Sequence, residues 1–401
     1  MNCKNGLYRP APRVKLSLKH PFIGLLSLFF VLSSGLAFAE PRMIPSPPIL
    51  AADSWLLLDA NSGHIIVEHN ADKRLPPASL TKMMTTYIAS EQIQNGTISM
   101  DDEVLVSEKA WRKGGSKMYI RVGTRVKVED LMRGVIIQSG NDASIALAEH
   151  IAGSEDAFAD LMNQQALALG MTNTQYQNAT GWPAPDHYTT AKDLAILAKA
   201  TVYDHPEDYS IYAEKEYTYN DIRQPNRNKL LWRDPSVDGI KTGHTEEAGY
   251  CLVASAKRDG MRLISVVMGT NSENARANES MKLLTYGFRF FDTVKSYEAN
   301  GQLVEPKIWL AANDTIKLGV GEDIWITIPR GAQKEVKAQL DFPSELRAPI
   351  AAGEQVGTVK LVLDDEVLQE TPLISLENAE EAGLFKRLWH HILLFVTGFL
   401  K

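Results

Sequence analysis

Three short motifs, in a fixed order along the chain, constrain this sequence more than any other feature. They are Ser79-Leu80-Thr81-Lys82, then Ser139-Gly140-Asn141, and then Lys241-Thr242-Gly243. Taken singly, the first two are weak signals and the third is a scarcer one, but chance does not readily produce all three in this order. Together they indicate a serine acyl-transfer site in which a lysine replaces the histidine of most serine hydrolases.

The local context of Ser79 supports this interpretation. Pro76-Pro77-Ala78 is typical of a helix start, and apolar residues follow at helical spacing, namely Leu80, Met83, Met84, Tyr87 and Ile88. We therefore expect Ser79 in the first turn of a helix whose other face enters the core. At a spacing of three residues, Lys82 is within reach of Ser79.

Lys82 can take a proton from Ser79 only if the pKa of its ammonium group falls. Burial lowers such a pKa, and a second cation lowers it further. Lys241 is the expected second cation. The helix N-terminus also favours negative charge on Ser79. The ordinary alternative, a capping serine beside a solvent-exposed lysine, would be favoured if the other motifs were absent.

The second motif supplies a hydroxyl and an amide. Ser139 can relay a proton towards a leaving amine, and Asn141 can bind a peptide group of the substrate. A plain turn between two helices is the alternative for a lone Ser-Gly-Asn sequence.

The third motif is predicted to end a strand. Lys241 and Thr242 can hold a terminal carboxylate there, and Gly243 lets a substrate backbone lie close to the strand edge. The backbone N–H groups of Ser79 and His244 are the expected oxyanion hole.

The N-terminus has the pattern of an export signal. A cationic stretch precedes an apolar run over 22–36, and Ala37-Phe38-Ala39 is a small-residue cleavage site. We expect a signal peptide over 1–39, a Pro-rich linker over 40–48 and an exported protein. An uncleaved membrane anchor is the alternative.

The composition argues against nucleic-acid binding, a metal site and a reactive cysteine. The chain has 401 residues, 44% of them hydrophobic, and a net charge of −7, which argues against a nucleic-acid partner. The nine histidines show no metal-ligand spacing, so no metal or cofactor is expected. Cys251 lies in an apolar run and is expected to be a buried structural thiol.

Periodicity predicts an α+β catalytic domain over 49–295. Strands at 55–59 and 64–69 form a hairpin, and the chain from about 100 to 215 is mainly helical, with helices at 129–137, 142–151 and 191–200. Strands follow at 238–243, 249–256 and 262–268, and then a helix over 276–291. We expect the two strand regions to share one antiparallel sheet, with the helices inserted as a second lobe.

The chain after residue 295 is predicted to form two parts. Strand runs at 324–328, 336–340 and 359–363, separated by turn residues, predict a small all-β domain over 296–376. An amphipathic helix is expected within 377–401. It is too short and too polar to span a bilayer, so it is expected to lie at a membrane surface with Trp389 at headgroup depth. The alternative is a helix that docks on the β domain.

These residues resemble the D-alanyl-D-alanine carboxypeptidases among the low-molecular-mass penicillin-binding proteins. The segment 224–231 and Arg276, upstream of 283–288, are also similar to that family. The resemblance implies a transpeptidase-like domain of the penicillin-binding and β-lactamase type, and removal of the last D-Ala from peptidoglycan peptide side chains. It also implies acylation by β-lactams and Arg276 near the substrate carboxylate. The expected location is the periplasm, with the terminal helix on the outer face of the cytoplasmic membrane.

Three alternatives remain open. A class A β-lactamase shares the fold and motifs but needs a Glu-x-x-Leu-Asn segment, and Glu91-Gln92-Ile93-Gln94-Asn95 lacks the leucine. An endopeptidase that cuts peptidoglycan cross-links uses the same chemistry on another bond. A non-catalytic cell-wall scaffold conflicts with the intact motifs, although the β domain could still bind other cell-wall enzymes.

Overall fold

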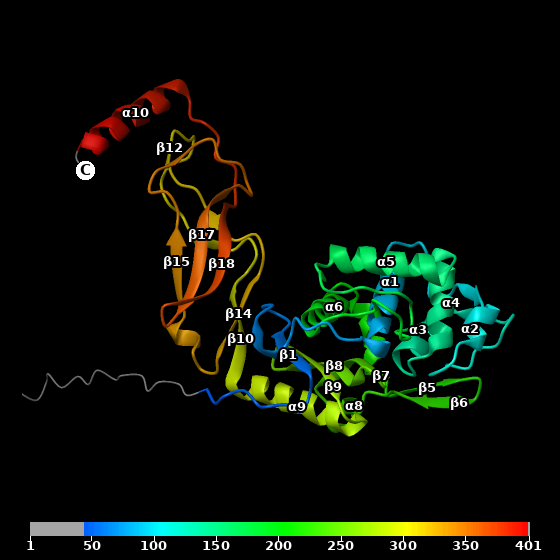
Figure 1. Cartoon of the computed structure of the whole chain (residues 1–401). Helices are drawn as coiled ribbons and strands as arrows, with labels where there is room; N and C mark the ends of the chain where they lie inside the picture. Colours follow the sequence, from blue (N-terminus) through cyan, green and yellow to red (C-terminus); the bar gives the residue numbers. More distant parts are fainter. Residues whose placement is uncertain (1–43, 400–401) are drawn as a thin grey trace, which may run out of the picture. The chain divides into compact units, whose positions relative to one another are not determined.

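A computed structural model describes residues 44–399, with side chains described as far as Val396 (Figure 1). The predicted signal peptide over 1–39 and the first four residues of the linker lie outside this range. Within it, no helix is long and apolar enough to cross a membrane.

An antiparallel sheet of five strands forms the centre of the catalytic region, in the order β2-β1-β9-β8-β7. Its strands are β1 (Ser54–Asp59), β2 (Ile65–His69), β7 (Val237–Thr245), β8 (Gly249–Arg258) and β9 (Met261–Thr270). The predicted sharing of one sheet by the first and last strand regions is thus confirmed.

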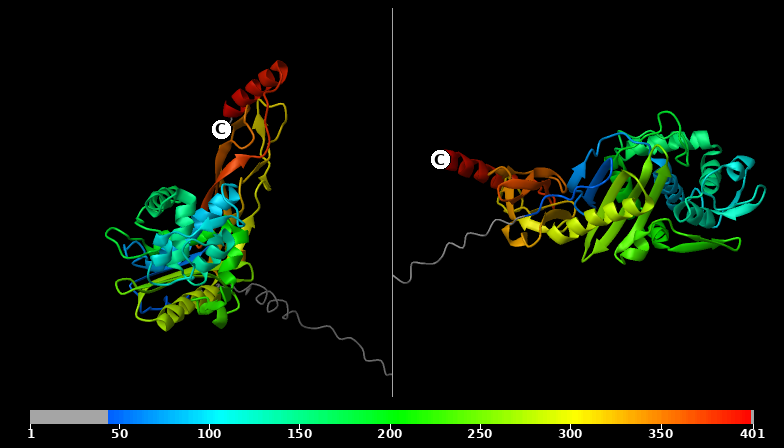
Figure 2. Two further views of the ribbon diagram at one scale, coloured as in Figure 1. Left: turned by 90° about the vertical axis from the view of Figure 1, so that its right-hand side faces the viewer. Right: turned by 60° about the horizontal axis from the view of Figure 1, so that its bottom comes forward.

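Both faces of this sheet are buried. Successive residues of a strand point to opposite faces, so neighbouring residues belong to different cores. Leu56 belongs to the core beneath the helical lobe, whereas its neighbour Leu57 packs with Leu283 and Leu284 of α9 (Glu273–Phe290). Figure 2 shows α9 running along one face of the sheet. Burial on two sides explains the nearly continuous apolar runs of β8 and β9.

The helical lobe covers the other face. It contains α1 (Lys82–Gln94), α2 (Glu108–Arg112), α3 (Val128–Ile136), α4 (Asn141–Ala152), α5 (Glu155–Ala168), α6 (Ala191–Tyr203) and α7 (Pro206–Tyr209). The short helix α8 (Leu230–Arg233) lies on the α9 side instead, where Leu230 and Leu231 share a buried cluster with Leu283. Two small ribbons join it, β3 (Glu103–Leu105) with β4 (Arg125–Lys127) and β5 (Glu216–Tyr219) with β6 (Ile222–Pro225). Helix α5 was not predicted from the sequence, although Ser154 caps it by accepting a hydrogen bond from the Ala157 amide at 3.1 Å.

The β region begins directly after α9. β10 (Phe291–Tyr297) pairs with β14 (Ile324–Pro329), so the expected domain boundary after residue 295 falls inside β10. A second sheet has the order β11-β13-β18-β17-β15, from β11 (Gln302–Val304), β13 (Leu318–Gly319), β18 (Glu366–Ser375), β17 (Gln355–Leu363) and β15 (Lys337–Asp341). The short strands β12 (Ile308–Trp309) and β16 (Leu346–Arg347) pair in parallel.

The last helix, α10 (Leu384–Phe399), follows this β region. Its polar side holds it there: the Leu310 amide donates to His390 Nδ1 at 2.8 Å, and Lys386 Nζ donates to the Ala312 carbonyl at 2.7 Å. Apolar side chains of the helix are exposed, 79% for Leu384 and 92% for Phe385. The helix therefore docks through its polar residues and leaves an apolar face uncovered.

Candidate active site

Ser79 and Lys82 meet at the start of α1. Ser79 lies in a single 3₁₀ turn, Ala78–Thr81, immediately before the helix, and not in its first α-helical turn as expected. Lys82 Nζ donates hydrogen bonds to Ser79 Oγ at 3.1 Å, to Asn141 Oδ1 at 2.8 Å and to the Thr180 carbonyl at 2.5 Å. Two of the three predicted motifs thus converge on one amine.

Lys82 is 1% exposed. Burial first, and then the nearby Arg227 guanidinium, lower the pKa of Lys82 to about 7, while the Asp142 carboxylate opposes the change. Lys241 was the predicted neighbouring cation, but the largest cationic influence on the pKa of Lys82 comes from Arg227. Near neutral pH a substantial fraction of Lys82 is therefore an uncharged amine, which can accept the proton of Ser79.

Ser139 and Lys241 form a second pair. Lys241 Nζ donates to Ser139 Oγ at 2.9 Å and to the Thr242 carbonyl at 3.1 Å. Ser139 has φ +64° in the tight turn between α3 and α4. Burial, and then the charges of Lys82 and Arg227, hold the pKa of Lys241 well below its ordinary value.

The structure shows why position 243 is a glycine, and this reason was not evident from the sequence. A Cβ at this position would lie 3.0 Å from the Pro77 carbonyl oxygen and 3.1 Å from Leu80 Cγ. The glycine therefore lets β7 approach the turn that carries Ser79, where we had expected room for a substrate backbone. The strand also continues past the motif to Thr245.

Arg276 supports β7. It is buried, and its Nη1 donates to the Gly243 carbonyl at 3.1 Å. Its guanidinium also lies 5.6 Å from the ring of Tyr250, on which His244 stacks at 3.9 Å. Thr242, next in the strand, is buried as well. The geometry brings Arg276 to the motif through the backbone of Gly243.

A cleft of about 940 Å³ opens above these residues. Ser79, Asn141, Thr180 and His244 reach its surface, as do the half-exposed rings of Tyr119 and Trp182. Arg227 lines it too, and its Nε donates to the Gln138 carbonyl at 2.9 Å. Arg227 belongs to the 224–231 segment, but no sequence pattern singled it out as a site residue.

Two further residues shape the cleft but were not predicted from the sequence. The Asp142 carboxylate accepts hydrogen bonds from the amides of Met118 and Tyr119, both at 2.8 Å, and so fixes the loop on one side. Asn178 Oδ1 accepts from the amides of Gly181 at 2.9 Å and Trp182 at 3.1 Å. The only sequence signal was their position beside turn residues.

Cys251 is buried, and burial raises the pKa of its thiol to about 11, which makes it unreactive. Among residues 44–399, no group of three or more His, Cys, Asp or Glu side chains is arranged to hold a metal ion.

A serine next to a buried, partly neutral lysine, with a second pair between Ser139 of the α3–α4 turn and Lys241 of β7, defines a serine hydrolase of the penicillin-binding fold. Residues 42–272 match the family model described as D-alanyl-D-alanine carboxypeptidase. Residues 291–381 match the model described as penicillin-binding protein 5, C-terminal domain. The chain therefore belongs to the D-alanyl-D-alanine carboxypeptidase family.

Individual relatives agree with this assignment. The chain is 45% identical over 376 residues to the D-alanyl-D-alanine carboxypeptidase DacC of Escherichia coli, covering 92% of this chain and 94% of the relative. It is also 45% identical to DacA of that species, with 88% and 89% covered. Penicillin-binding protein 5 of Haemophilus influenzae superposes with a TM-score of 0.82 at 43% identity, covering 84% of this chain and all of the other.

Proposed function

We propose that this protein is a D,D-carboxypeptidase that removes the terminal D-Ala from peptidoglycan pentapeptides through an acyl-enzyme on Ser79. The observation that carries the proposal is the 3.1 Å contact between Ser79 Oγ and a Lys82 amine with a pKa of about 7. Such an amine can act as a general base at neutral pH, which an ordinary lysine cannot do.

Acylation would proceed in the cleft. Ser79 Oγ attacks the carbonyl carbon of the last peptide bond while Lys82 Nζ takes its proton. The proton then reaches the leaving amine nitrogen through the Ser139 hydroxyl, which Lys241 orients, and the C–N bond breaks. The backbone N–H groups of Ser79 and His244 stabilise the oxyanion, and a water molecule later hydrolyses the ester.

Binding of the substrate carboxylate requires positive charge in the cleft. Lys241 and Thr242 form the predicted carboxylate site, and we add Arg227, which lines the cleft. Arg276 has its positioning contact with Gly243 and adds positive charge behind the strand. Asn141 is proposed to bind a peptide group of the substrate. β-Lactams, which carry a carboxylate and a strained amide, would acylate the same serine.

The β-lactamase alternative requires a carboxylate base beside Ser79. Glu91 lies about 18 Å along the helix axis from Ser79, at a rise of about 1.5 Å per residue. Its carboxylate contacts His205 Nε2 at 2.9 Å. We therefore propose slow hydrolysis of the penicilloyl-enzyme. An endopeptidase and a cell-wall scaffold remain as the other candidates.

Release of D-Ala from diacetyl-Lys-D-Ala-D-Ala tests this function. The matched control is the same peptide with a C-terminal amide, which lacks the carboxylate that the cations would bind. We expect the free acid to be cleaved faster by about 100-fold. Equal cleavage of both peptides would favour an endopeptidase, and no cleavage of either would favour the scaffold.

We also propose export to the periplasm, with α10 resting on the outer surface of the cytoplasmic membrane. The exposed apolar side chains of α10 support this, because a soluble protein rarely leaves such a face uncovered. Its polar residues are already engaged with the β region, so the helix would reach the membrane without detaching.

A further inference from the structure

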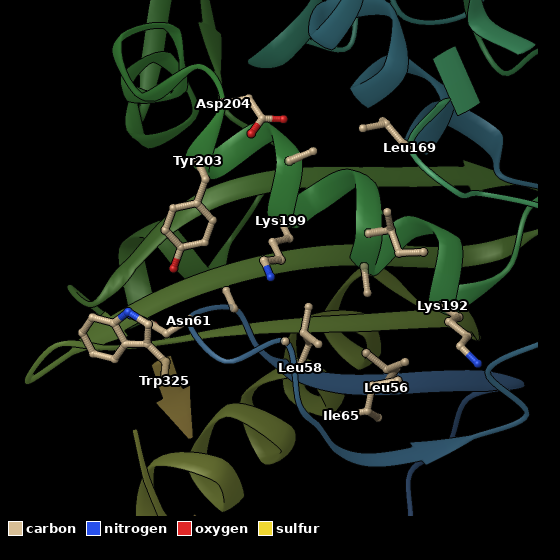
Figure 3. A pocket seen from close by; sticks show the side chains of 15 residues that line it. Leu56, Leu58, Asn61, Ile65, Leu169, Lys192, Lys199, Tyr203, Asp204 and Trp325 are labelled. Carbon is tan, nitrogen blue, oxygen red and sulfur yellow. The ribbon is translucent and has the colours of Figure 1, made fainter. Parts of the chain in front are cut away.

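A second cavity of about 700 Å³ lies apart from the catalytic motifs, between α6 and the β1–β2 hairpin (Figure 3). Trp325 of β14 stands at one end of it. The floor is apolar and includes Leu56, Leu58, Ile65 and Ala195. The size and the concave apolar lining are typical of sites for small organic ligands.

One cation of this cavity has no counter-ion. Lys199 points from α6 into the space near Leu58 and Asn61 (Figure 3). It is partly buried, and within residues 44–399 it has neither an ion pair nor a hydrogen bond from its side chain. Its Nζ would lie 3.4 Å from a Cβ built on Gly63, so the ammonium group sits against the hairpin turn.

The two other charged side chains of the lining each have a partner. Lys192 pairs with Asp72 at 3.6 Å. The Asp204 carboxylate accepts a hydrogen bond from the Tyr87 hydroxyl at 2.9 Å. Lys199 is therefore the cation of the lining that lacks a counter-charge, and an apolar surface beside a cation is complementary to an amphipathic anion.

We propose that this cavity binds a small aryl-alkyl carboxylate. The carboxylate pairs with Lys199, the alkyl chain lies on Leu58 and Ile65, and the aromatic ring packs towards Trp325 and Tyr203. A ligand placed in this way contacts both the catalytic sheet and the β region, because Trp325 belongs to β14. The proposal is independent of the D,D-carboxypeptidase function.

Equilibrium dialysis of the full chain with 4-phenylbutanoate tests the proposal. Lys199→Met, which keeps the aliphatic stem but removes the charge, is expected to raise the dissociation constant about tenfold or more. Ala195→Phe, which fills the cavity, should have a similar effect. Lys192→Met is the matched control and should change binding less than about threefold, because its charge already has a partner. Thermal unfolding of each variant establishes that it is folded.

The neutral analogue 4-phenylbutan-1-ol isolates the contribution of charge. The wild-type protein should bind it no better than Lys199→Met binds the carboxylate. Equal effects of Lys192→Met and Lys199→Met would overturn the proposal, as would the absence of measurable binding at millimolar ligand. Loss of binding in Trp182→Ala would also overturn it, because that result would place the ligand in the catalytic cleft.

Discussion

At the scale of single residues, burial does most to make a lysine usable as a base. Lys82 is enclosed, and its ammonium form loses hydration that its three hydrogen bonds only partly replace. The motif spacing predicted the Ser79–Lys82 contact, because three residues span one helical turn. It could not predict Arg227, which reaches the site from a loop distant in the sequence and acts through space.

The pKa of about 7 for Lys82 predicts a pH dependence of acylation. Below pH 7 the amine is protonated and cannot accept the serine proton, so the rate should fall about tenfold per pH unit. Above pH 7 the neutral amine predominates and the rate should level off. The second-order rate constant for labelling by a fluorescent penicillin between pH 5 and 9 measures this. A rate that does not change between pH 5 and 7 would contradict the role of Lys82.

Gly181 offers a second test at this scale. It has φ +78°, and an added Cβ would lie 1.7 Å from the Ala78 carbonyl oxygen, beside the turn that carries Ser79. Gly181→Ala should therefore destabilise the protein by about 2 kcal/mol or more and slow acylation at least tenfold. Gly170 has φ +83° and open space, so Gly170→Ala isolates the backbone cost, about 1 kcal/mol, without loss of acylation. Equal acylation rates for the two variants would refute the packing argument.

At the scale of elements, periodicity predicted α10 as an amphipathic helix but left its docking open. Its polar residues contact Leu310 and Ala312, more than 70 positions earlier in the chain for each pair. Such contacts follow from how the β region folds, which a helical pattern cannot report. The same limit explains why α5 was missed: its apolar stripe becomes clear only against the helices that it covers.

The uncovered face of α10 predicts membrane binding. The double variant Phe385→Glu and Leu388→Glu places two charges on that face and should weaken binding to phospholipid vesicles by at least about 100-fold. Sedimentation of the full chain with vesicles gives the bound fraction. Lys386→Gln, on the side that contacts the β region, is the control and should sediment with the vesicles almost as wild type does. Undiminished sedimentation of the double variant would point to another anchor.

At the scale of the whole described chain, one buried cluster joins the catalytic sheet to the β region. Asp59, at the end of β1, accepts hydrogen bonds from the hydroxyls of Thr327, at 2.7 Å, and Thr293. Ser62 Oγ lies 2.6 Å from Thr327 Oγ1. Asp59 and Thr327 are both buried, so their hydrogen bonds do not compete with water.

Thr327→Val tests this connection. The variant keeps the shape of the side chain but leaves the buried Asp59 carboxylate without one donor. It should lower the free energy of unfolding by about 2 kcal/mol in urea. Thr315, whose hydroxyl donates to Glu305 at the surface, provides the control, and Thr315→Val should cost less than about 0.5 kcal/mol. If Thr327→Val lowered the free energy of unfolding as little as Thr315→Val, the cluster would not hold the two regions together.

The overall architecture was largely predictable because its strands are long and apolar and its motifs lie at element ends. Trp55 and Val253, for example, lie in runs that only a buried strand explains. The start of β10 was harder to predict from the sequence, because Phe291 is both the end of a helical pattern and the first residue of a strand. Tertiary pairing with β14 decides between the two.

Mass spectrometry of the full chain mixed with penicillin G, followed over time, tests the central claim most directly. We expect one penicilloyl adduct per chain, located on Ser79, that persists for minutes and is absent from Ser79→Ala. An adduct on the Ser79→Ala variant, or none on the wild type, would contradict the assignment of Ser79 as the nucleophile. An adduct that forms on Ser79 but disappears within seconds would contradict slow deacylation and favour a β-lactamase.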